Sequence, residues 1–578
     1  MKSIFGKIFT IFDRKEKIVF FALSILIIVN TFLELLSIGL IIPIISIIFS
    51  PDILPDYLLE IEIIKDFIFS ENFVGYLLSL MLVIYFLKNF LLGIIHIIQT
   101  NYIFGLQKRL STKIFNNFLS KEYFFHLMNS RARLIQIVTG EVNNFVGRVI
   151  SPIMILITEI FVSLGIILIV LMNDVNILNL IYFLTLILII YYFYLKNKIL
   201  KWGEDRRVGE SNRIRLANET LQSIKEIKIF NKENFFLENF IFNNNKSVEA
   251  SKKLTYLNIL PRIITELIII SFLVFFLFFK LEQNINPERI IGTLAIFAAA
   301  AFRIMPSINR IMMSFQSLRF GIPVINPILK NYLLNSKLLY KEKKVNKIKF
   351  KGLLFQNVKF NYLDKKKLFN KLNFKINKND KIAIIGQSGS GKTTLLNLII
   401  GFLKPFRGKI YLNNKSLSFK DLFGWQQIIA YIPQRTCLIN DTIINNIRLD
   451  SRIKVNSKKL LKCLKDSELI KDIKTNKISL RKKVGEDGVN LSEGQRQRLS
   501  IARALYHDRQ ILILDEATSS LDQNNQRKIL NTISKLKDKT IIMVTHSTDN
   551  LKIFNKVFFM KNRNLYLKKN KYLKVRLL

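Results

Sequence analysis

The chain has 578 residues, of which 50% are hydrophobic and 22% charged, and its formal net charge is +45. Soluble chains rarely combine a mean hydropathy of +0.25 with so many charges, so we expect apolar and polar material to be segregated along the sequence. The length allows two or three domains. The two cysteines, Cys437 and Cys463, both lie in the polar second half. Two cysteines placed in this way do not indicate a disulfide framework and favour a reducing cytosol.

The net charge of +45 raises the possibility of a nucleic-acid partner. However, lysine, asparagine, isoleucine and phenylalanine are abundant along the whole chain, and no aromatic–basic interleaving or zinc-knuckle spacing is present. We therefore expect no nucleic-acid binding, and attribute the charge to compositional bias and to attraction toward an anionic inner leaflet. The first apolar run is too long for a signal peptide, so no cleavable leader is expected.

Six apolar runs in the first half are long enough to cross a bilayer, which takes about 20 helical residues. Soluble core helices explain one such run but not six. The last run is the weakest, because it contains Arg303 and Pro306. The predicted spans are residues 18–49, 74–100, 150–172, 177–196, 257–280 and 290–312.

Loop charges predict the orientation of these spans. Residues 1–17 are mostly basic, whereas the first outer loop, residues 50–73, is mostly acidic. Basic flanks stay cytoplasmic, so both termini are expected inside.

The connections between spans alternate in length. Residues 101–149 and 197–256 are long, polar and periodic. They predict helical hairpins that project into the cytosol, with tips near His126–Arg133 and Phe230–Phe236.

Several charged residues fall within or at the ends of the predicted spans, where a charge is costly unless it faces a bundle interior or a wet cavity. One interpretation is snorkelling to the interface or internal ion pairing. The other is that Lys88 and Arg303 line a cavity that receives an anionic headgroup. The charged residues are Glu34, Lys88, Glu159, Arg262, Glu266 and Arg303.

The second half contains a phosphate-binding motif. The apolar stretch KIAII at 381–385 predicts a buried strand, GQSGSGKT at 386–393 matches G-x-x-x-x-G-K-T, and an apolar helix follows. In this strand–loop–helix context the motif predicts ATP or GTP binding. Lys392 would reach the β- and γ-phosphates, and the Thr393 hydroxyl would ligate Mg²⁺. The expected nucleotide contacts are Gly386, Ser388, Gly389, Gly391, Lys392, Thr393 and Thr394.

A second motif supplies carboxylates. The stretch ILILDE at 511–516 predicts a buried strand that ends in two acids. Asp515 would hold Mg²⁺, and Glu516 is placed to polarise the attacking water.

Between these motifs, LSEGQ at 491–495 leads into a predicted helix. With SSLD at 519–522 and a later histidine, the whole chain resembles the ABC exporter-type half-transporters. The resemblance implies a six-span α-helical transmembrane domain with long cytosolic hairpins, followed by an α/β P-loop nucleotide-binding domain. It further implies that Ser492, Gly494 and Gln495 of one copy close over ATP held by the phosphate loop of another, so a homodimer is expected. The expected boundaries are 1–325 for the membrane domain, 326–345 for a linker and 346–578 for the ATP-binding domain.

The resemblance assigns four more residues. Tyr362, in VKFNY, matches the aromatic residue that stacks on adenine, and Gln434, in YIPQ, matches a residue that links Mg²⁺ to the membrane-domain contact. Asp522 belongs to the segment that crosses the dimer interface, and His546 matches the histidine that contacts the γ-phosphate. The expected catalytic residues are thus Glu516, His546 and Gln434, and the expected Mg²⁺ ligands are Thr393, Gln434 and Asp515.

One position departs from the family pattern, which has glycine where Glu493 stands. A carboxylate near the γ-phosphate weakens ATP capture unless the side chain points outward while Ser492 and Gly494 bind the phosphate. Two competent sites per dimer are expected.

Short stretches of the membrane half look most like the flippases for lipid-linked oligosaccharides of bacteria: FLELLSIG at 32–39, YFLKN at 85–89, IKEIK at 224–228 and FRIMPSINR at 302–310. This resemblance implies a multi-pass inner-membrane protein that moves a polyprenyl-diphosphate-linked glycan. The alternative substrates are a lipopolysaccharide precursor, a phospholipid or a drug.

Two other classes of protein share part of this sequence pattern of apolar spans and nucleotide-binding motifs. A soluble ABC ATPase would not need six apolar spans. An ATP-gated channel would tolerate loss of Glu516, whereas an ATP-driven pump would not.

Overall fold

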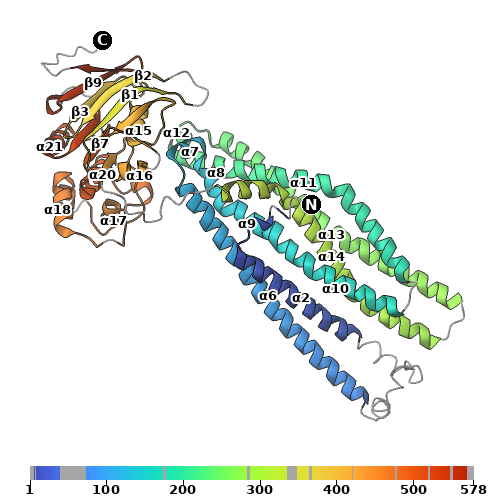
Figure 1. Ribbon diagram of the computed structural model, residues 1–578. Helices are drawn as coiled ribbons and strands as arrows, with labels where there is room; N and C mark the ends of the chain where they lie inside the picture. The colour runs from blue at the N-terminus through green and yellow to red at the C-terminus, as the bar shows by residue number, and fades with distance from the viewer. Residues whose placement is uncertain are drawn as a thin grey trace. The chain divides into compact units, whose positions relative to one another are not determined.

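The computed structural model groups the chain into two units (Figure 1). The first unit comprises Met1–Lys121 and His126–Lys337, and the second comprises Glu122–Phe125 and Leu338–Leu578. The domain boundaries expected from the sequence stay a prediction. The structure describes residues 6, 8–39, 73–173, 177–282, 287–334, 348–362, 368–418, 421–452, 454–475, 478–518, 521–546 and 551–568.

Long helices dominate the described part of the first unit, and several of them run alongside one another (Figure 1). A short helix, α7 (Tyr123–Met128), follows α6 along the chain. The helices are α2 (Arg14–Gly39), α6 (Phe73–Leu119), α8 (Arg131–Gln136), α9 (Val142–Phe145), α10 (Ser151–Asn173), α11 (Ile177–Gln222), α12 (Ile224–Ile229), α13 (Glu233–Glu282) and α14 (Pro287–Tyr332), and two π-helical segments, η2 (Ile137–Glu141) and η3 (Val146–Ile150), flank α9.

The helical extensions predicted for the two long connections are confirmed. Helix α6 continues from its apolar run to Leu119, and the chain turns near Ser130 before it continues through α8 to α10. Helix α11 continues to Gln222, and α13 begins at Glu233, so the second hairpin turns close to the predicted tip. The π-helical segments were not predicted, because their sequence continues the same apolar periodicity as the helices around them.

Five helical stretches in the described residues are long and apolar enough to cross a membrane. Exposed side chains such as Leu82 (73% exposed) and Phe86 (72% exposed) lie along α6; a helix that presents such residues outward is suited to an apolar surrounding. The predicted span 290–312 lies in α14, but most of its side chains lie outside the described residues, so the count of six stays a prediction. The five stretches are Arg14–Leu36, Leu78–Leu119, Arg131–Ile167, Tyr182–Gln222 and Glu233–Phe275.

An ionic cluster around Arg109 joins three distant parts of the first unit. The guanidinium donates to Glu16 through Nε (2.5 Å) and Nη2 (2.6 Å), to the Ile11 carbonyl (2.8 Å) and to the Tyr332 hydroxyl (2.8 Å). Asp13 lies 3.1 Å from Nη1. Because a planar guanidinium offers five donors in a fixed fork, one side chain fixes the N-terminal segment against α6 and the end of α14.

Two sheets form the framework of the second unit. A four-stranded antiparallel sheet has the order β2-β1-β4-β5, and a six-stranded sheet has the order β10-β9-β3-β8-β7-β6. The strands are β1 (Gly352–Phe360), β2 (Phe369–Asn377), β3 (Lys381–Gly386), β4 (Arg407–Leu412), β5 (Lys415–Ser416), β6 (Ile429–Ile432), β7 (Ile511–Asp515), β8 (Thr540–Val544), β9 (Lys556–Lys561) and β10 (Asn564–Lys568).

Strands β3, β7 and β8 are continuous apolar runs because helices cover both faces of a parallel sheet. Every residue of β7 and β8 is buried. The α/β class expected for this half is therefore confirmed. The helices are α15 (Lys392–Ile400), α16 (Leu422–Gln427), α17 (Ile443–Arg448), α18 (Ser457–Asp466), α19 (Leu469–Lys474), α20 (Glu493–His507) and α21 (Gln523–Ser534).

Replacing Arg109 with methionine should destabilise the first unit by about 1–3 kcal/mol, because it leaves Glu16 partly buried without its cation. The measurement is the midpoint of thermal unfolding in detergent. Arg215→Met is the matched control, since Arg215 lies 4.0 Å from Glu219 with both side chains more than half exposed. Equal midpoints for the two variants would contradict a structural role for the Arg109 cluster.

Candidate functional site

Four neighbouring parallel strands of the larger sheet end at the same edge. Strands β3, β8, β7 and β6 lie side by side in that order. Ligands of open parallel sheets bind at the carboxyl ends of the strands. The phosphate loop follows β3, His546 follows β8, Asp515 and Glu516 end β7, and Gln434 follows β6. The fold thus brings the two sequence motifs to one edge of the sheet, together with Gln434 and His546, two of the residues that the family resemblance singled out.

The loop after β3 has the backbone that its glycines predict. Gly391 has φ 107° and is the N-cap of α15. A Cβ at this position would lie 2.9 Å from the Phe369 ring, so both backbone and space favour glycine. The Lys392 ammonium donates to the carbonyls of Gly386 (2.8 Å) and Gln387 (2.9 Å). The lysine ammonium therefore lies against the loop that leads into the start of α15, where helix N–H groups attract anions. Ser388, Gly389, Thr393 and Thr394 belong to the same loop and first helical turn.

Ser390 is a member of this loop that sequence reasoning missed. Its hydroxyl oxygen is buried and has no hydrogen-bond partner among the described residues. An unmet buried hydroxyl costs free energy unless a ligand or water satisfies it. The loop therefore fits an anionic group with oxygen acceptors, such as a phosphate.

Asp515 is only 3% exposed, and the Tyr431 hydroxyl donates to its Oδ2 at 3.2 Å. Burial raises the pKa of the Asp515 carboxyl, and the hydrogen bond from Tyr431 opposes that shift. Burial lowers the pKa of Lys392, while the carboxylates of Glu516 and Asp515 oppose that change. These opposing charges indicate that the lysine and both acids share one local electrostatic environment.

Glu516 is held at both carboxylate oxygens. His546 Nε2 lies 2.7 Å from Oε1, and Gln434 Nε2 donates to Oε2 at 2.7 Å. Its backbone is left-handed, with φ 51°, a conformation that costs a non-glycine residue about 1–3 kcal/mol. The Glu516 N–H donates to the Val544 carbonyl at 3.1 Å, which fixes this turn onto β8. The structure thus brings the three residues expected to be catalytic into one hydrogen-bonded group.

Tyr362 lies beside the phosphate-loop helix. Its hydroxyl is 3.1 Å from the Thr394 Oγ1, and its ring meets Phe360 edge to face with centroids 5.0 Å apart. Its expected stacking on adenine stays a prediction.

Ser492, Gly494, Gln495 and Asp522 lie at helix starts. Ser492 is the N-cap of α20 and Asp522 that of α21. Two hydrogen bonds from the Asn525 main chain and side chain lower the pKa of Asp522. Among the described residues, no hydrogen bond or ion pair links these four residues to the phosphate loop or to Glu516. The structure of one chain thus does not join them to the strand-end site.

The expected Mg²⁺ ligands Thr393, Gln434 and Asp515 offer a hydroxyl, an amide and a carboxylate. Oxygen ligands of this kind suit Mg²⁺, which keeps several waters and phosphate oxygens in its shell. The described residues contain no group of three or more His, Cys, Asp or Glu side chains that could hold a metal alone. The donor set therefore fits a metal that shares its shell with a nucleotide.

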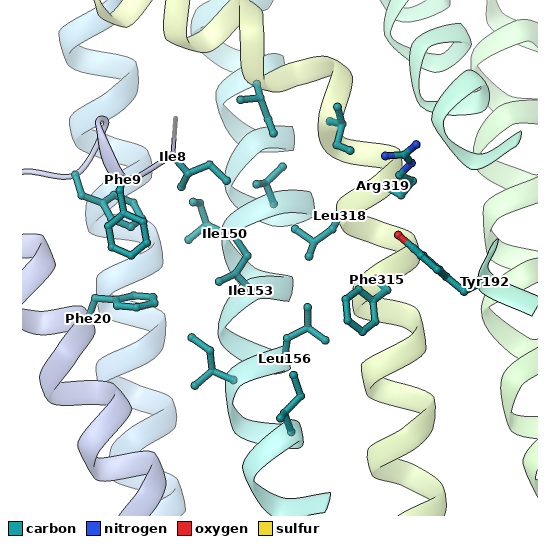
Figure 2. Close-up of a pocket in the computed structure, with 16 residues that line it drawn as sticks. Ile8, Phe9, Phe20, Ile150, Ile153, Leu156, Tyr192, Phe315, Leu318 and Arg319 are labelled. Atoms are coloured by element: carbon teal, nitrogen blue, oxygen red, sulfur yellow. The ribbon is translucent and has the colours of Figure 1, made fainter. Parts of the chain in front are cut away.

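A cavity of about 420 Å³ lies within the first unit. Figure 2 shows its apolar lining from the N-terminal segment, α2, η3, α10 and α14, with Tyr192 and Arg319 at one side. Arg319 donates from Nε to the Lys196 carbonyl at 3.1 Å. Elsewhere in the first unit, Arg310 Nε lies 2.7 Å from Oε1 of the buried Glu159, so the internal-pair interpretation holds for Glu159. Lys88 lies over the Tyr85 ring at 4.6 Å, and the Arg303 side chain lies outside the described residues.

Comparisons with known proteins cover both halves. The family profile for the ABC transporter transmembrane region matches residues 18–305, and the ABC transporter profile matches residues 369–519. The chain is 39% identical over 196 residues to an ATP-dependent lipid A-core flippase of Pasteurella multocida, covering 34% of each chain. It is 28% identical over 344 residues to the enzyme of the same name in Coxiella burnetii, covering 59% of this chain and 57% of that one.

These matches span less than two thirds of the relatives' own lengths. In fold, the chain is similar to a bacterial Atm1-family ABC exporter with ATP bound, with a TM-score of 0.73, 18% identity and coverage of 96% of this chain and 94% of that one. The chain therefore belongs to the ABC transporters, as an exporter-type half-transporter that carries one membrane region and one ATPase domain in a single polypeptide.

Proposed function

We propose that this chain uses ATP hydrolysis to export or flip an amphiphilic lipid across the inner membrane. The observation that carries the proposal is the Glu516 carboxylate, held by Gln434 and His546 beside a phosphate loop. In the part of the chain that the structure describes, five helical stretches are long and apolar enough to cross a membrane. The presence of a nucleotide-hydrolysing site and a membrane region in one chain supports coupling between ATP hydrolysis and transport of the lipid.

In the proposed site, the loop from Gly386 to Thr394 binds the phosphates of ATP and Lys392 neutralises their charge. Thr393, Gln434 and Asp515 would hold Mg²⁺, which supplies further positive charge to the phosphate oxygens when bound. Tyr362 stacks on adenine.

Glu516 acts as the base toward the attacking water. A carboxylate oxygen that accepts one hydrogen bond keeps a second lone pair, so the contacts to Gln434 and His546 orient the group without exhausting its acceptors. Because Glu516 is fixed by its turn and by two partners, the oxygen that takes the proton is positioned before the substrate arrives. His546 also contacts the γ-phosphate.

We further propose that two copies form a homodimer in which Ser492, Gly494, Gln495 and Asp522 complete the site of the partner. Within the described part of one chain, these residues make no hydrogen bond to the phosphate loop, which supports an arrangement in trans. Both termini, in this proposal, lie on the cytoplasmic side of six spans, so the nucleotide sites use cytoplasmic ATP.

For the substrate, we propose a polyprenyl-diphosphate-linked oligosaccharide. The proposal rests on the residue patterns around Lys88 and Arg303, whose positive charges suit a diphosphate. The apolar cavity of about 420 Å³ in the first unit suits a hydrocarbon chain. The names of the relatives favour a second candidate, a lipid A-like glycolipid.

Glu516→Gln should retain ATP binding and lower steady-state hydrolysis by about 100-fold or more, because an amide cannot accept the water proton. The measurements are phosphate release and retention of labelled ATP. Glu468→Gln is a matched control, since Glu468 shares the left-handed backbone (φ 58°) but pairs with Lys471. Hydrolysis by Glu516→Gln near the unmodified rate would overturn the assignment and would suit an ATP-gated channel.

Tyr431→Phe removes the hydrogen bond that lowers the pKa of Asp515. Without this bond, the folded-state pKa of the Asp515 carboxyl should rise further, so protons compete with Mg²⁺ at a higher pH. The apparent Mg²⁺ affinity of the ATPase should therefore fall more steeply for the variant than for the unmodified chain as the pH is lowered from 7.5 to 5.5. Tyr566→Phe, at a 55% exposed site, is the control. Parallel pH profiles would show that Tyr431 does not set the Asp515 pKa.

The two lipid candidates are separated by reconstitution in vesicles. A polyprenyl-diphosphate glycan should stimulate ATP hydrolysis and appear in the outer-facing leaflet, whereas lipid A should do neither. Lys88→Gln and Arg303→Gln should each weaken transport about tenfold while basal hydrolysis persists, because each removes a cation that faces the diphosphate. Transport that survives both changes would refute the headgroup role, and stimulation by lipid A alone would select the second candidate.

A further inference from the structure

We propose that Arg496 is a positioning residue, which holds the unusual Glu493 carboxylate away from the start of α20 and so keeps the Ser492 loop open to a phosphate. This inference rests on the proposed function, since it concerns how that loop receives the γ-phosphate of ATP bound by the partner copy.

A capping box shapes the start of α20. The Ser492 N–H donates to Gln495 Oε1 at 2.9 Å, and the Gln495 N–H donates to Ser492 Oγ at 3.3 Å. These reciprocal bonds fix the first helical turn. They use the Ser492 oxygen as an acceptor, so its hydroxyl proton stays available to donate to an anion.

The backbone N–H groups of Glu493 and Gly494 are the next donors at this helix start. The first N–H groups of a helix have no partner within it, and no hydrogen bond to either is found among the described residues. Together with the Ser492 hydroxyl, they form a set of donors suited to a phosphate.

The Glu493 carboxylate can compete with a phosphate for these donors. Helical side chains lean toward the N-terminus of their helix, and the positive end of the helix dipole attracts a carboxylate in the first turn. Without another partner, the Glu493 side chain would fold over the same N–H groups and compete with the phosphate. Its charge would also repel the phosphate directly.

Arg496 supplies the alternative partner. Its Nε donates to Glu493 Oε2 at 3.1 Å, and its Nη2 makes a second, shorter contact with the same oxygen. The pair has i,i+3 spacing, so it draws the carboxylate along the helix surface toward the second turn.

The arginine stem is itself constrained. A Cβ added at Gly488, which precedes α20, would lie 3.2 Å from Arg496 Cδ and 2.6 Å from a Leu438 methyl. The stem therefore passes closely over the Gly488 loop, and the Arg496 side chain is only 27% exposed. A guanidinium positioned in this way is better placed to hold a carboxylate than a fully solvated one.

Exposed pairs of this spacing contribute little to folding stability. The expected effect of the Glu493–Arg496 pair therefore concerns ligand capture and not folding. Loss of the arginine leaves one uncompensated negative charge beside the phosphate site and releases the carboxylate toward the free N–H groups.

The test is a double-mutant cycle on the full-length chain in detergent or nanodiscs, with ATP dependence of hydrolysis as the readout. Arg496→Met should raise the KM for ATP about three- to tenfold at low salt, with little change in kcat. Glu493→Gly in the Arg496→Met background should bring the KM back to within about twofold of the unmodified value. Arg496→Lys should retain most of the affinity, since it keeps the charge.

Lys471→Met is the matched control, because Lys471 pairs with Glu468 at the same i,i+3 spacing elsewhere in the second unit. The Arg496→Met defect should shrink at high salt, where charges are screened. A defect that persists unchanged in the double variant, or an unchanged KM in Arg496→Met, would overturn the inference. An unmodified chain that hydrolyses no ATP would instead contradict the proposed function.

Discussion

The candidate site depends on the register of four parallel strands. Ile384 of β3, Val544 of β8 and Asp515 of β7 lie at one level across the sheet. The residues that follow each of them, on the phosphate loop, at His546 and at Glu516, therefore emerge at one edge. Because side chains alternate between the faces of a strand, a slip of one residue in β7 would turn Asp515 to the opposite face and separate it from Tyr431. The buried apolar composition of β7 and β8 fixes the register that the chemistry requires.

Backbone strain and a main-chain hydrogen bond together fix Glu516 at this edge of the sheet. Glu516 adopts a left-handed backbone that an ordinary turn would avoid, and its main-chain bond to Val544 holds it there. The cost of that conformation is offset by the buried core beneath it, where the apolar residues of β7, β8 and α20 pack. The first unit differs, since its long helices expose apolar side chains and the ion pairs of Arg109 hold its N-terminal segment.

Sequence reasoning could predict the strand–loop–helix around Lys392 and the acidic end of β7, because residue types and local order specify both. It also predicted the two helical hairpins, since polar but periodic stretches follow the second and the fourth apolar runs. It could not predict that Tyr431 would reach Asp515 or that Gln434 and His546 would hold Glu516. The contacts of Tyr431 and Gln434 join residues 84 and 82 positions apart, and the contact of His546 joins residues 30 positions apart. All three follow only from strand order and register. The Glu493–Arg496 spacing is visible in the sequence, but the sequence does not specify whether the carboxylate points to the arginine or to the helix start.

The number of membrane spans stays a prediction for a different reason, because the apolar part of α14 lies largely outside the described side chains.

The central claim is that each ATP lies between the phosphate loop of one copy and the Ser492 loop of a second. The most direct test is co-expression of two inactive chains with different affinity tags, Lys392→Ala and Ser492→Arg, followed by sequential purification on both tags. In such a mixed dimer one site carries both defects and the other carries neither. The account predicts that the mixed dimer regains ATP hydrolysis well above either variant alone. Hydrolysis that stays at the background of the single variants would contradict sites shared between copies.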